Sequence, residues 1–214
     1  IEAPHGDWQR EGNTIAVPRG PGLGLSFEAP ISATASVDST NDLPCPLASS
    51  AIARPDHPAL ITADQTLSYR QLADEAARRA GALYARGVRP GMVVALRGRR
   101  DVNFVLCFHA LAWLGACVAP LPEQAPSSEM DRLIASLSPQ LVLDANAPLA
   151  PATALEERFW PRDEARLIVF TSGSTTEAKP IRLSTEQLFL SATGSAFRLG
   201  HDPNDRWLCC LPLH

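Results

Sequence analysis

Apolar residues recur every three or four positions in three segments of the chain, and this spacing predicts three helices. These segments are residues 69–83, 102–115 and 128–137. The first helix is expected to begin with a capping box formed by Ser68 and Gln71, and Gly87 can close it in a left-handed conformation. Asp101 caps the second segment, which is apolar nearly all round and is therefore expected to be buried. Pro139 stops the third helix.

Short apolar runs alternate with these helices and predict buried strands. They cover residues 92–96, 117–121, 140–143 and 166–170. Helices that alternate with fully apolar strands are typical of parallel sheets covered on both faces. The pattern therefore predicts an α/β fold of layered parallel or mixed sheets with flanking helices. A strand over residues 181–183 and a helix capped by Ser184 and Gln187 are expected to follow.

The first 45 residues differ in texture from the rest of the chain. Residues 1–30 combine a short β-prone run with glycine and proline, which predicts a short β/turn tail. Residues 31–45 are rich in Ser, Thr, Ala, Asp and Pro and are expected to form a linker, so that residues 46–214 make up the main domain. The sequence begins with Ile1 and stops directly after a strand-like apolar run, so we expect it to be truncated at both ends.

Composition excludes several classes of protein. Of the 214 residues, 45% are hydrophobic and 20% are charged, which excludes a disordered tail, a collagen-like repeat and a coiled coil. The net charge of −4 provides no basic surface for nucleic acid or an anionic membrane, and no apolar run reaches the ~20 residues of a spanning helix. The five cysteines form no C-x-x-C pair and no signal peptide is recognisable, so we expect a protein of the reducing cytoplasm without a metal site.

A loop rich in hydroxyl groups follows the strand predicted at residues 166–170. Its candidate ligand-binding residues are Thr171, Ser172, Gly173, Ser174, Thr175, Thr176 and Lys179. Hydroxyls, backbone N–H groups and an ammonium are the donors that a polyphosphate needs, and Gly173 lets the backbone approach the ligand. Lys179 is the one lysine among 19 basic residues, which favours a need for its compact charge. A solvated Ser/Thr turn without function is the alternative, whereas the Walker pattern is absent.

The loop resembles the signature T-S-G-[ST]-T-G-x-P-K-G of the adenylate-forming superfamily, which contains acyl- and aryl-CoA ligases, luciferases and peptide-synthetase adenylation domains. Residues 171–175 and Lys179 match this signature, whereas Thr176, Ala178 and Pro180 depart from it. Three further segments resemble the family in the same order along the chain. They are residues 67–72, 111–121 and 211–214. The resemblance covers residues 46–214 and implies the N-terminal portion of an AMP-binding adenylation domain.

This resemblance implies a two-step reaction that uses ATP, Mg²⁺ and CoA. A carboxylate attacks the α-phosphate of ATP to give an acyl-adenylate and pyrophosphate, and the thiol of CoA then displaces AMP. The loop would hold the β- and γ-phosphates, and His214 falls in a substrate-binding segment of the family. The family's metal-binding and catalytic residues lie beyond His214, so residues 1–214 alone are expected to be inactive.

Residues 1–30 resemble the closing segment of enolase-superfamily proteins, which often end in P-x-G-P-G-L-G, here at residues 18–24. Within that superfamily, o-succinylbenzoate synthase makes the acid that an acid–CoA ligase activates next in menaquinone synthesis. The two resemblances together imply o-succinylbenzoate as the small-molecule carboxylic acid. Two alternatives stay open: transfer of the acyl group to a carrier protein, and a degenerate module that binds nucleotide or acid without chemistry.

Overall fold

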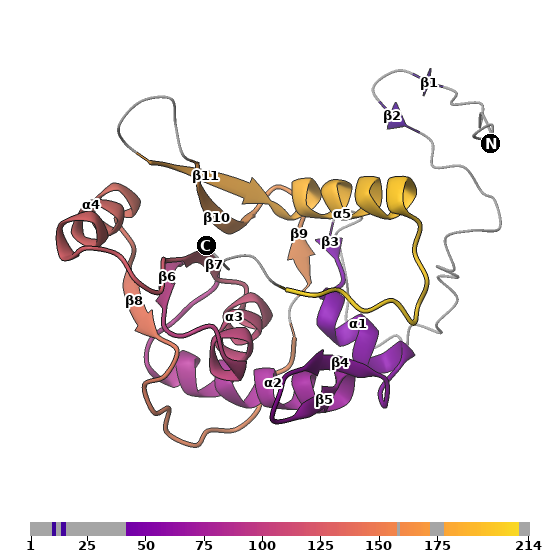
Figure 1. Cartoon of the computed structure of the whole chain (residues 1–214), viewed down its shortest axis with the longest axis horizontal. Helices are drawn as coiled ribbons and strands as arrows, with labels where there is room; N and C mark the ends of the chain where they lie inside the picture. Colours follow the sequence, from indigo (N-terminus) through magenta and orange to yellow (C-terminus); the bar gives the residue numbers. More distant parts are fainter. Residues whose placement is uncertain (1–9, 12–13, 16–41, 158, 172–177, 210–214) are drawn as a thin grey trace.

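The computed structural model describes residues 10–11, 14–15, 42–157, 159–171 and 178–209 (Figure 1). The helices in this part are α1 (Pro46–Ala53), α2 (Tyr69–Ala85), α3 (Val102–Leu114), α4 (Ser127–Leu137) and α5 (Thr185–Leu199). The strands are β1 (Arg10–Glu11), β2 (Thr14–Ile15), β3 (Asp42–Leu43), β4 (Pro58–Ile61), β5 (Thr66–Ser68), β6 (Val93–Arg97), β7 (Cys117–Pro120), β8 (Leu141–Asp144), β9 (Trp160–Pro161), β10 (Ala165–Thr171) and β11 (Lys179–Ser184). Helices and strands alternate through the middle of the chain, as the apolar pattern predicts.

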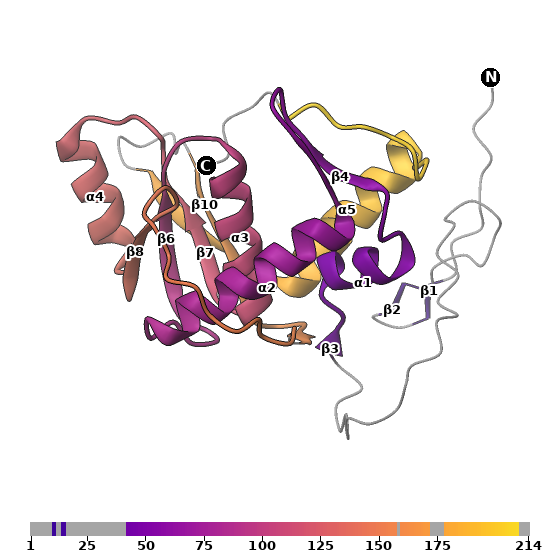
Figure 2. The ribbon, with the colours of Figure 1, turned by 90° about the horizontal axis from the view of Figure 1, so that it is seen from below.

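A five-stranded sheet in the order β11-β10-β7-β6-β8 forms the centre of the described structure. Strands β10, β7, β6 and β8 are parallel, and β11 closes one edge by pairing antiparallel with β10. The chain passes from β6 through α3 to β7 and then returns through α4 to β8 on the other side of β6. Right-handed crossovers in opposite directions place α3 and α4 on opposite faces of the sheet (Figure 2). The predicted mixed α/β sheet with flanking helices is confirmed.

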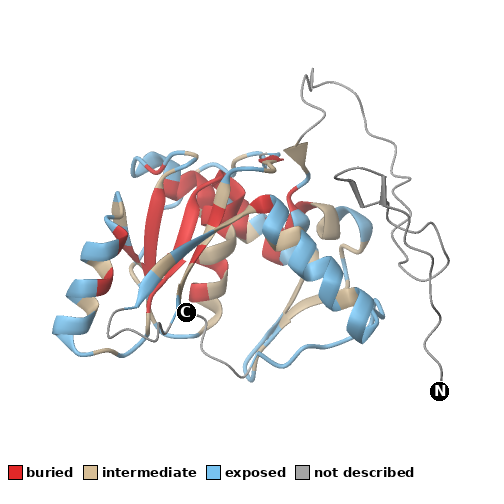
Figure 3. Ribbon diagram, turned by 90° about the horizontal axis from the view of Figure 1, so that it is seen from above, coloured by how far each residue is buried: buried red, intermediate tan, exposed pale blue. Residues whose placement is uncertain are grey.

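Alternate side chains of the central strands point into two separate cores. Val94 and Leu96 of β6 pack in the core beneath α2 and α3, whereas Val93 and Ala95 pack in the core beneath α4. All four residues of β7 and most of α3 are buried, so the centre of the molecule forms the buried zone of Figure 3. The apolar run at residues 104–120 therefore forms a buried helix followed by a buried strand.

Local capping explains where the main helices begin. The Ser68 hydroxyl accepts a hydrogen bond from the Gln71 backbone N–H at 3.3 Å, and the Gln71 side chain accepts one from the Ser68 N–H at 2.9 Å. The Asp101 carboxylate caps α3, which ends at Gly115 with a φ of 82°. A second capping box starts α5. These caps confirm the boundaries that the sequence predicts at these positions.

The connection between β8 and β9 lies tightly against α2. The Leu155 backbone N–H donates to the Ala77 carbonyl at 3.1 Å, and Trp113 Nε1 donates to the Leu155 carbonyl at 2.9 Å. A Cβ atom at Gly81 would overlap the carbonyl oxygen of Thr153. Glycine at this helix position therefore permits the close approach of two backbones.

Besides the antiparallel pair of β1 and β2, two short pairings lie outside the central sheet. Residues 42 and 43, which fall within the predicted linker, form β3 and pair antiparallel with β9. Strands β4 and β5 form a small antiparallel hairpin directly before α2. Neither pairing follows from the periodicity of the sequence, because each strand is only two to four residues long.

Candidate functional site

The hydroxyl-rich loop connects the two strands of the β10–β11 hairpin. Thr171 and Lys179 are cross-strand partners at the loop end of this hairpin, so their side chains project from the same face. Both residues are exposed, whereas Ile168 of β10 is fully buried in the core beneath α4. The hairpin thus presents a hydroxyl and an ammonium together, at the end of a strand that is anchored in the core.

Only part of the predicted loop can be placed. Thr171 and Lys179 are brought together, as described above, while the other candidates lie outside the described residues. These are Ser172, Gly173, Ser174, Thr175, Thr176 and His214. Arg182 is the next basic residue along β11, and it lies on the opposite face from Lys179 because the two are three positions apart in a strand.

The base of the same hairpin contains a buried arginine, Arg166. Its Nη2 donates to Glu164 Oε2 at 2.8 Å, and its Nη1 donates to the carbonyl oxygen of Gly115 at 2.6 Å. Its Nε donates to Thr185 Oγ1 at 3.3 Å, and its Cζ lies 5.5 Å from the centre of the Trp160 ring. Sequence analysis missed this residue, although an arginine inside an apolar strand is the signal that could have found it.

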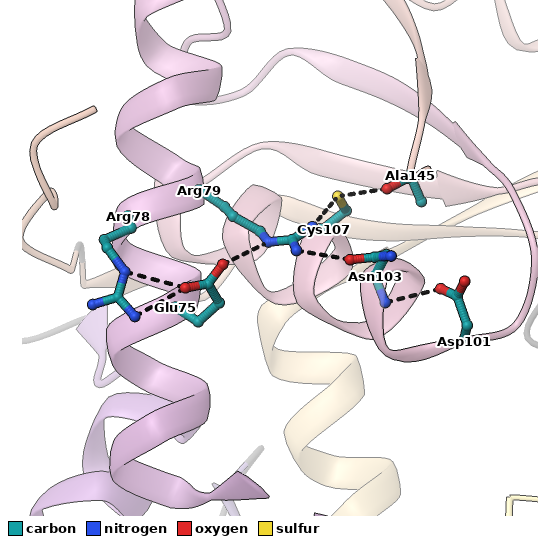
Figure 4. Close-up of polar contacts among 7 residues, drawn as sticks. All are labelled: Glu75, Arg78, Arg79, Asp101, Asn103, Cys107 and Ala145. Atoms are coloured by element: carbon teal, nitrogen blue, oxygen red, sulfur yellow. Dashed lines mark hydrogen bonds and ion pairs between the residues drawn. The ribbon is translucent and has the colours of Figure 1, made fainter. Parts of the chain in front are cut away.

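A second polar cluster joins α2 to α3 on the face of the sheet away from α4 (Figure 4). Arg79 donates to Glu75 at 3.1 Å, to Asn103 Oδ1 at 2.8 Å and to Cys107 Sγ at 3.5 Å. Partial burial favours a higher pKa for the Glu75 carboxyl, but its bonds to Arg78 and Arg79 outweigh this effect and lower the pKa. A cavity of about 300 Å³ adjoins the cluster, but no residue of β10 or β11 lines it. The cluster therefore connects two helices and lies apart from the hairpin.

Burial also sets the protonation of several other groups. It lowers the pKa of His109, on α3, from 6.5 to about 4, so this imidazole is neutral near pH 7. It raises the pKa values of Cys45, Cys107 and Cys117, so these thiols stay protonated and behave as small apolar side chains. The histidine and the three buried cysteines are therefore packing residues of the scaffold.

Within the described ranges, no group of three or more His, Cys, Asp or Glu side chains is placed to hold a metal ion. The described side chains therefore do not fit a resident Mg²⁺ site. None of the described helices is long and apolar enough to cross a membrane.

Comparison with known families extends the likeness well beyond the loop. The family model described as AMP-binding enzyme matches residues 47–214 of the chain. That match covers most of the 214 residues and contains the sheet, its flanking helices and the hairpin. The chain therefore belongs to the family of AMP-binding enzymes.

Two curated relatives illustrate the range of the family. The 2-succinylbenzoate–CoA ligase of Listeria innocua is 28% identical over 174 aligned residues, and the match covers 74% of this chain and 37% of the relative. Enterobactin synthase component F of Escherichia coli is 29% identical over 153 aligned residues, and the match covers 63% of this chain and 12% of that protein. The chain thus spans little more than a third of the ligase that it matches.

Solved structures agree with the fold. The o-succinylbenzoate CoA synthetase of Bacillus subtilis, in complex with the acyl-adenylate intermediate OSB-AMP, superimposes with a TM-score of 0.75 at 26% identity, over 80% of this chain and 50% of that one. The same enzyme in complex with ATP and magnesium gives a TM-score of 0.73 at 26% identity, over 80% and 40% of the two chains. The arrangement described here is therefore that of an N-terminal part of the adenylate-forming fold.

Proposed function

We propose that the intact protein activates a carboxylic acid with ATP and that residues 171–179 hold the β- and γ-phosphates. The observation that carries this proposal is the placement of Thr171 and Lys179 on one face at the loop end of a hairpin whose Ile168 is buried in the core. Serine and threonine hydroxyls donate hydrogen bonds to phosphate oxygens, and the Lys179 ammonium offsets their charge. Ser172, Gly173, Ser174, Thr175 and Thr176 complete the proposed phosphate-binding loop.

The proposed chemistry needs no covalent bond to the protein. A carboxylate oxygen attacks the α-phosphorus of ATP, the bond from that phosphorus to the bridging oxygen breaks, and pyrophosphate leaves with the bonding electrons. A thiol then attacks the acyl carbon, loses its proton and expels AMP. The loop residues would orient the leaving pyrophosphate and offset the charge that it gains, which is electrostatic positioning.

For the acid and the acceptor we propose o-succinylbenzoate and CoA. The names of the Listeria and Bacillus relatives support this choice, as does the likeness of residues 1–30 to the tail of an enolase-superfamily o-succinylbenzoate synthase. We further propose that residues 1–30 are that tail, that residues 31–45 are a linker, and that residues 46–214 begin the adenylation domain. His214 would contribute to the acid-binding segment, and residues 1–214 alone would not complete the reaction.

A second candidate function is the loading of a carrier protein. The likeness to enterobactin synthase component F over 63% of this chain favours it, because the signature that residues 171–179 resemble also occurs in peptide-synthetase adenylation domains. The experiment is to incubate the intact protein with ATP, o-succinylbenzoate and either CoA or a phosphopantetheinylated carrier protein. Formation of the CoA thioester is the expected result. Loading of the carrier alone would favour the second function, and no pyrophosphate exchange with any acid would leave only a binding module.

Lys179 tests the role of the loop within this assay. We expect Lys179→Ala to weaken kcat/KM for ATP by roughly 1.5–3 kcal/mol, about 10- to 150-fold, because a charged hydrogen bond to phosphate is lost. Arg182→Ala is the matched control, since it removes a cation from the opposite face of the same strand. Unchanged kinetics in Lys179→Ala would remove the lysine from the proposed site.

A further inference from the structure

Arg166 is the one charged residue that is buried within the described part of the chain, with 4% of its surface exposed. The other buried polar residue in the same part of the chain is Thr185, which is fully buried. Taking a guanidinium out of water is costly unless its donors are satisfied. The surroundings of Arg166 supply the necessary acceptors, and they come from three different segments.

Each acceptor belongs to a different part of the fold. The Gly115 carbonyl lies just after the C-terminal end of α3, where the helix dipole is negative, and it also accepts a hydrogen bond from the Gly91 backbone N–H at 2.8 Å. Thr185 is the first residue of α5, and Glu164 lies in the turn before β10. One side chain therefore links α3, α5 and the start of the hairpin.

The hydrogen bond to Gly115 joins the hairpin to the end of α3, whereas Glu164 and Thr185 lie at the base of the hairpin itself. The Thr185 N–H donates to the Glu164 carbonyl at 3.0 Å, and the Glu186 N–H donates to the Arg162 carbonyl at 2.9 Å, so these backbone bonds close the base of the hairpin on itself. Between β10 and β7 the recorded register consists of a single residue pair in the parallel ladder. The Arg166–Gly115 bond adds a charged link at this junction.

We propose that Arg166 is a positioning residue for the nucleotide loop: by tying the base of the β10–β11 hairpin to the end of α3, it sets where Thr171 and Lys179 meet the terminal phosphates. This inference rests on the proposed function. Thr171 lies five positions after Arg166, about 16 Å along the strand at ~3.3 Å per residue, so a tilt of about 5° at the base displaces the loop end of the hairpin by more than 1 Å. Displacements of about 1 Å in a positioned group can cost on the order of 100-fold in rate.

The geometry requires arginine in particular. Its planar guanidinium offers donors in several fixed directions, which matches acceptors on three segments. A lysine at position 166 keeps the charge but not the fork, and a methionine keeps only the apolar stem. The series Arg166→Lys and Arg166→Met therefore separates the charge from its geometry.

The test compares ATP and AMP binding by calorimetry on the intact protein and its variants, at a temperature where circular dichroism shows each to be folded. AMP lacks the β- and γ-phosphates, so a displaced loop should weaken ATP binding while AMP binding stays unchanged. We expect the dissociation constant for ATP to rise about tenfold in Arg166→Met and about threefold in Arg166→Lys. Arg162→Met is the matched control, because Arg162 is a neighbouring arginine whose ion pair with Glu186 is largely exposed.

Each outcome decides the question. Equal loss of ATP and AMP affinity in Arg166→Met, or no loss of either, would overturn the positioning role. If that variant does not fold, Arg166→Lys takes its place, and an unchanged ATP affinity there would overturn the role as well. If the unmodified protein binds ATP no more tightly than AMP, the proposed function of the loop fails, and this result is separate from any variant.

Discussion

Helices α3 and α5 follow two strands of one sheet, β6 and β11, yet they are packed very differently. Eight of the 13 residues of α3 are buried, whereas Thr185 is the one buried residue recorded in the 15-residue helix α5. Figure 3 shows the contrast between a buried centre and an exposed α5. On α5, Leu190 and Leu199 are 64% and 68% exposed. The residues around α3 bury most of their apolar surface, whereas several apolar side chains of α5 are exposed.

The contrast matters because the proposed phosphate-binding loop belongs to the β10–β11 hairpin, which leads directly into the exposed helix α5. A buried scaffold resists change, since its side chains interlock on all sides. In the β10–β11 hairpin, Ile168 is fully buried whereas Thr171 and Lys179 are exposed, so small shifts of the strands reach these two residues. Substitutions in the buried region around α3 should therefore differ in effect from those in α5.

Leucine truncation gives the largest expected effect. Leu111→Ala in α3 should lower the free energy of unfolding by about 3 kcal/mol, because Leu111 is fully buried and the change leaves a cavity. Leu190→Ala in α5 should change it by less than about 0.5 kcal/mol. Urea unfolding of the two variants measures both values. Similar losses would mean that α5 is as tightly packed as α3.

Replacing glycine by alanine should change the stability of the protein in opposite directions in α2 and in α5. Gly81→Ala in α2 should destabilise the fold by about 2 kcal/mol, because the new Cβ overlaps the Thr153 carbonyl and the backbone has to shift. Gly194→Ala in α5 meets nothing within 4 Å and should stabilise the protein by about 0.5–1 kcal/mol through helix propensity. Thermal unfolding midpoints decide between these signs, and a stabilised Gly81→Ala would contradict the close approach.

Acid should weaken the scaffold through His109. Its pKa is about 4 in the folded protein and about 6.5 when unfolded, so the unfolded state binds more protons between these values. The free energy of unfolding should therefore fall by about 1–2 kcal/mol between pH 7 and pH 5, and His109→Gln should remove this slope. The Glu75 carboxyl affects stability at a lower pH than His109. Its lowered pKa provides stability that is lost only as the pH falls below about 4.5. An unchanged slope in His109→Gln would contradict the burial of this imidazole.

Two adjacent arginines of α2, Arg78 and Arg79, give the smallest expected difference. Arg79→Met should cost about 1 kcal/mol because Arg79, with 19% of its side chain exposed, bonds to both α2 and α3. Arg78→Met should cost less than about 0.5 kcal/mol, since its side chain is 56% exposed and its hydrogen bonds go to Glu75 within the same helix. Chemical unfolding of both variants at low and high salt tests this pair. Equal costs would show that the link between the helices contributes nothing.

Much of the fold could be predicted because its signals are local. The Ser68–Gln71 box and the Asp101 cap depend on residues within one turn, and the alternation of apolar runs indicates the buried strands. Pairings between distant segments left no such signal. Residues 42–43 pair with residues 160–161, more than 100 positions away, and nothing in either stretch specifies its partner.

In the candidate site, too, local features could be predicted from the sequence and contacts between distant segments could not. Its loop was found from a cluster of hydroxyls next to the chain's one lysine, and the register pairs Thr171 with Lys179. The three acceptors around Arg166 lie in different segments, so no local pattern could reveal their convergence. The identity of the acid depends on a pocket that these residues do not complete.

The most direct measurement of the central claim is amide hydrogen exchange on the intact protein with Mg²⁺-ATP, with AMP or with neither. If residues 171–179 hold the terminal phosphates, ATP should slow exchange in peptides covering these residues, and AMP should leave them nearly unchanged. Peptides from α3 should serve as the unaffected internal reference. Equal protection by both nucleotides, or none by ATP, would contradict the assignment of this loop to the terminal phosphates.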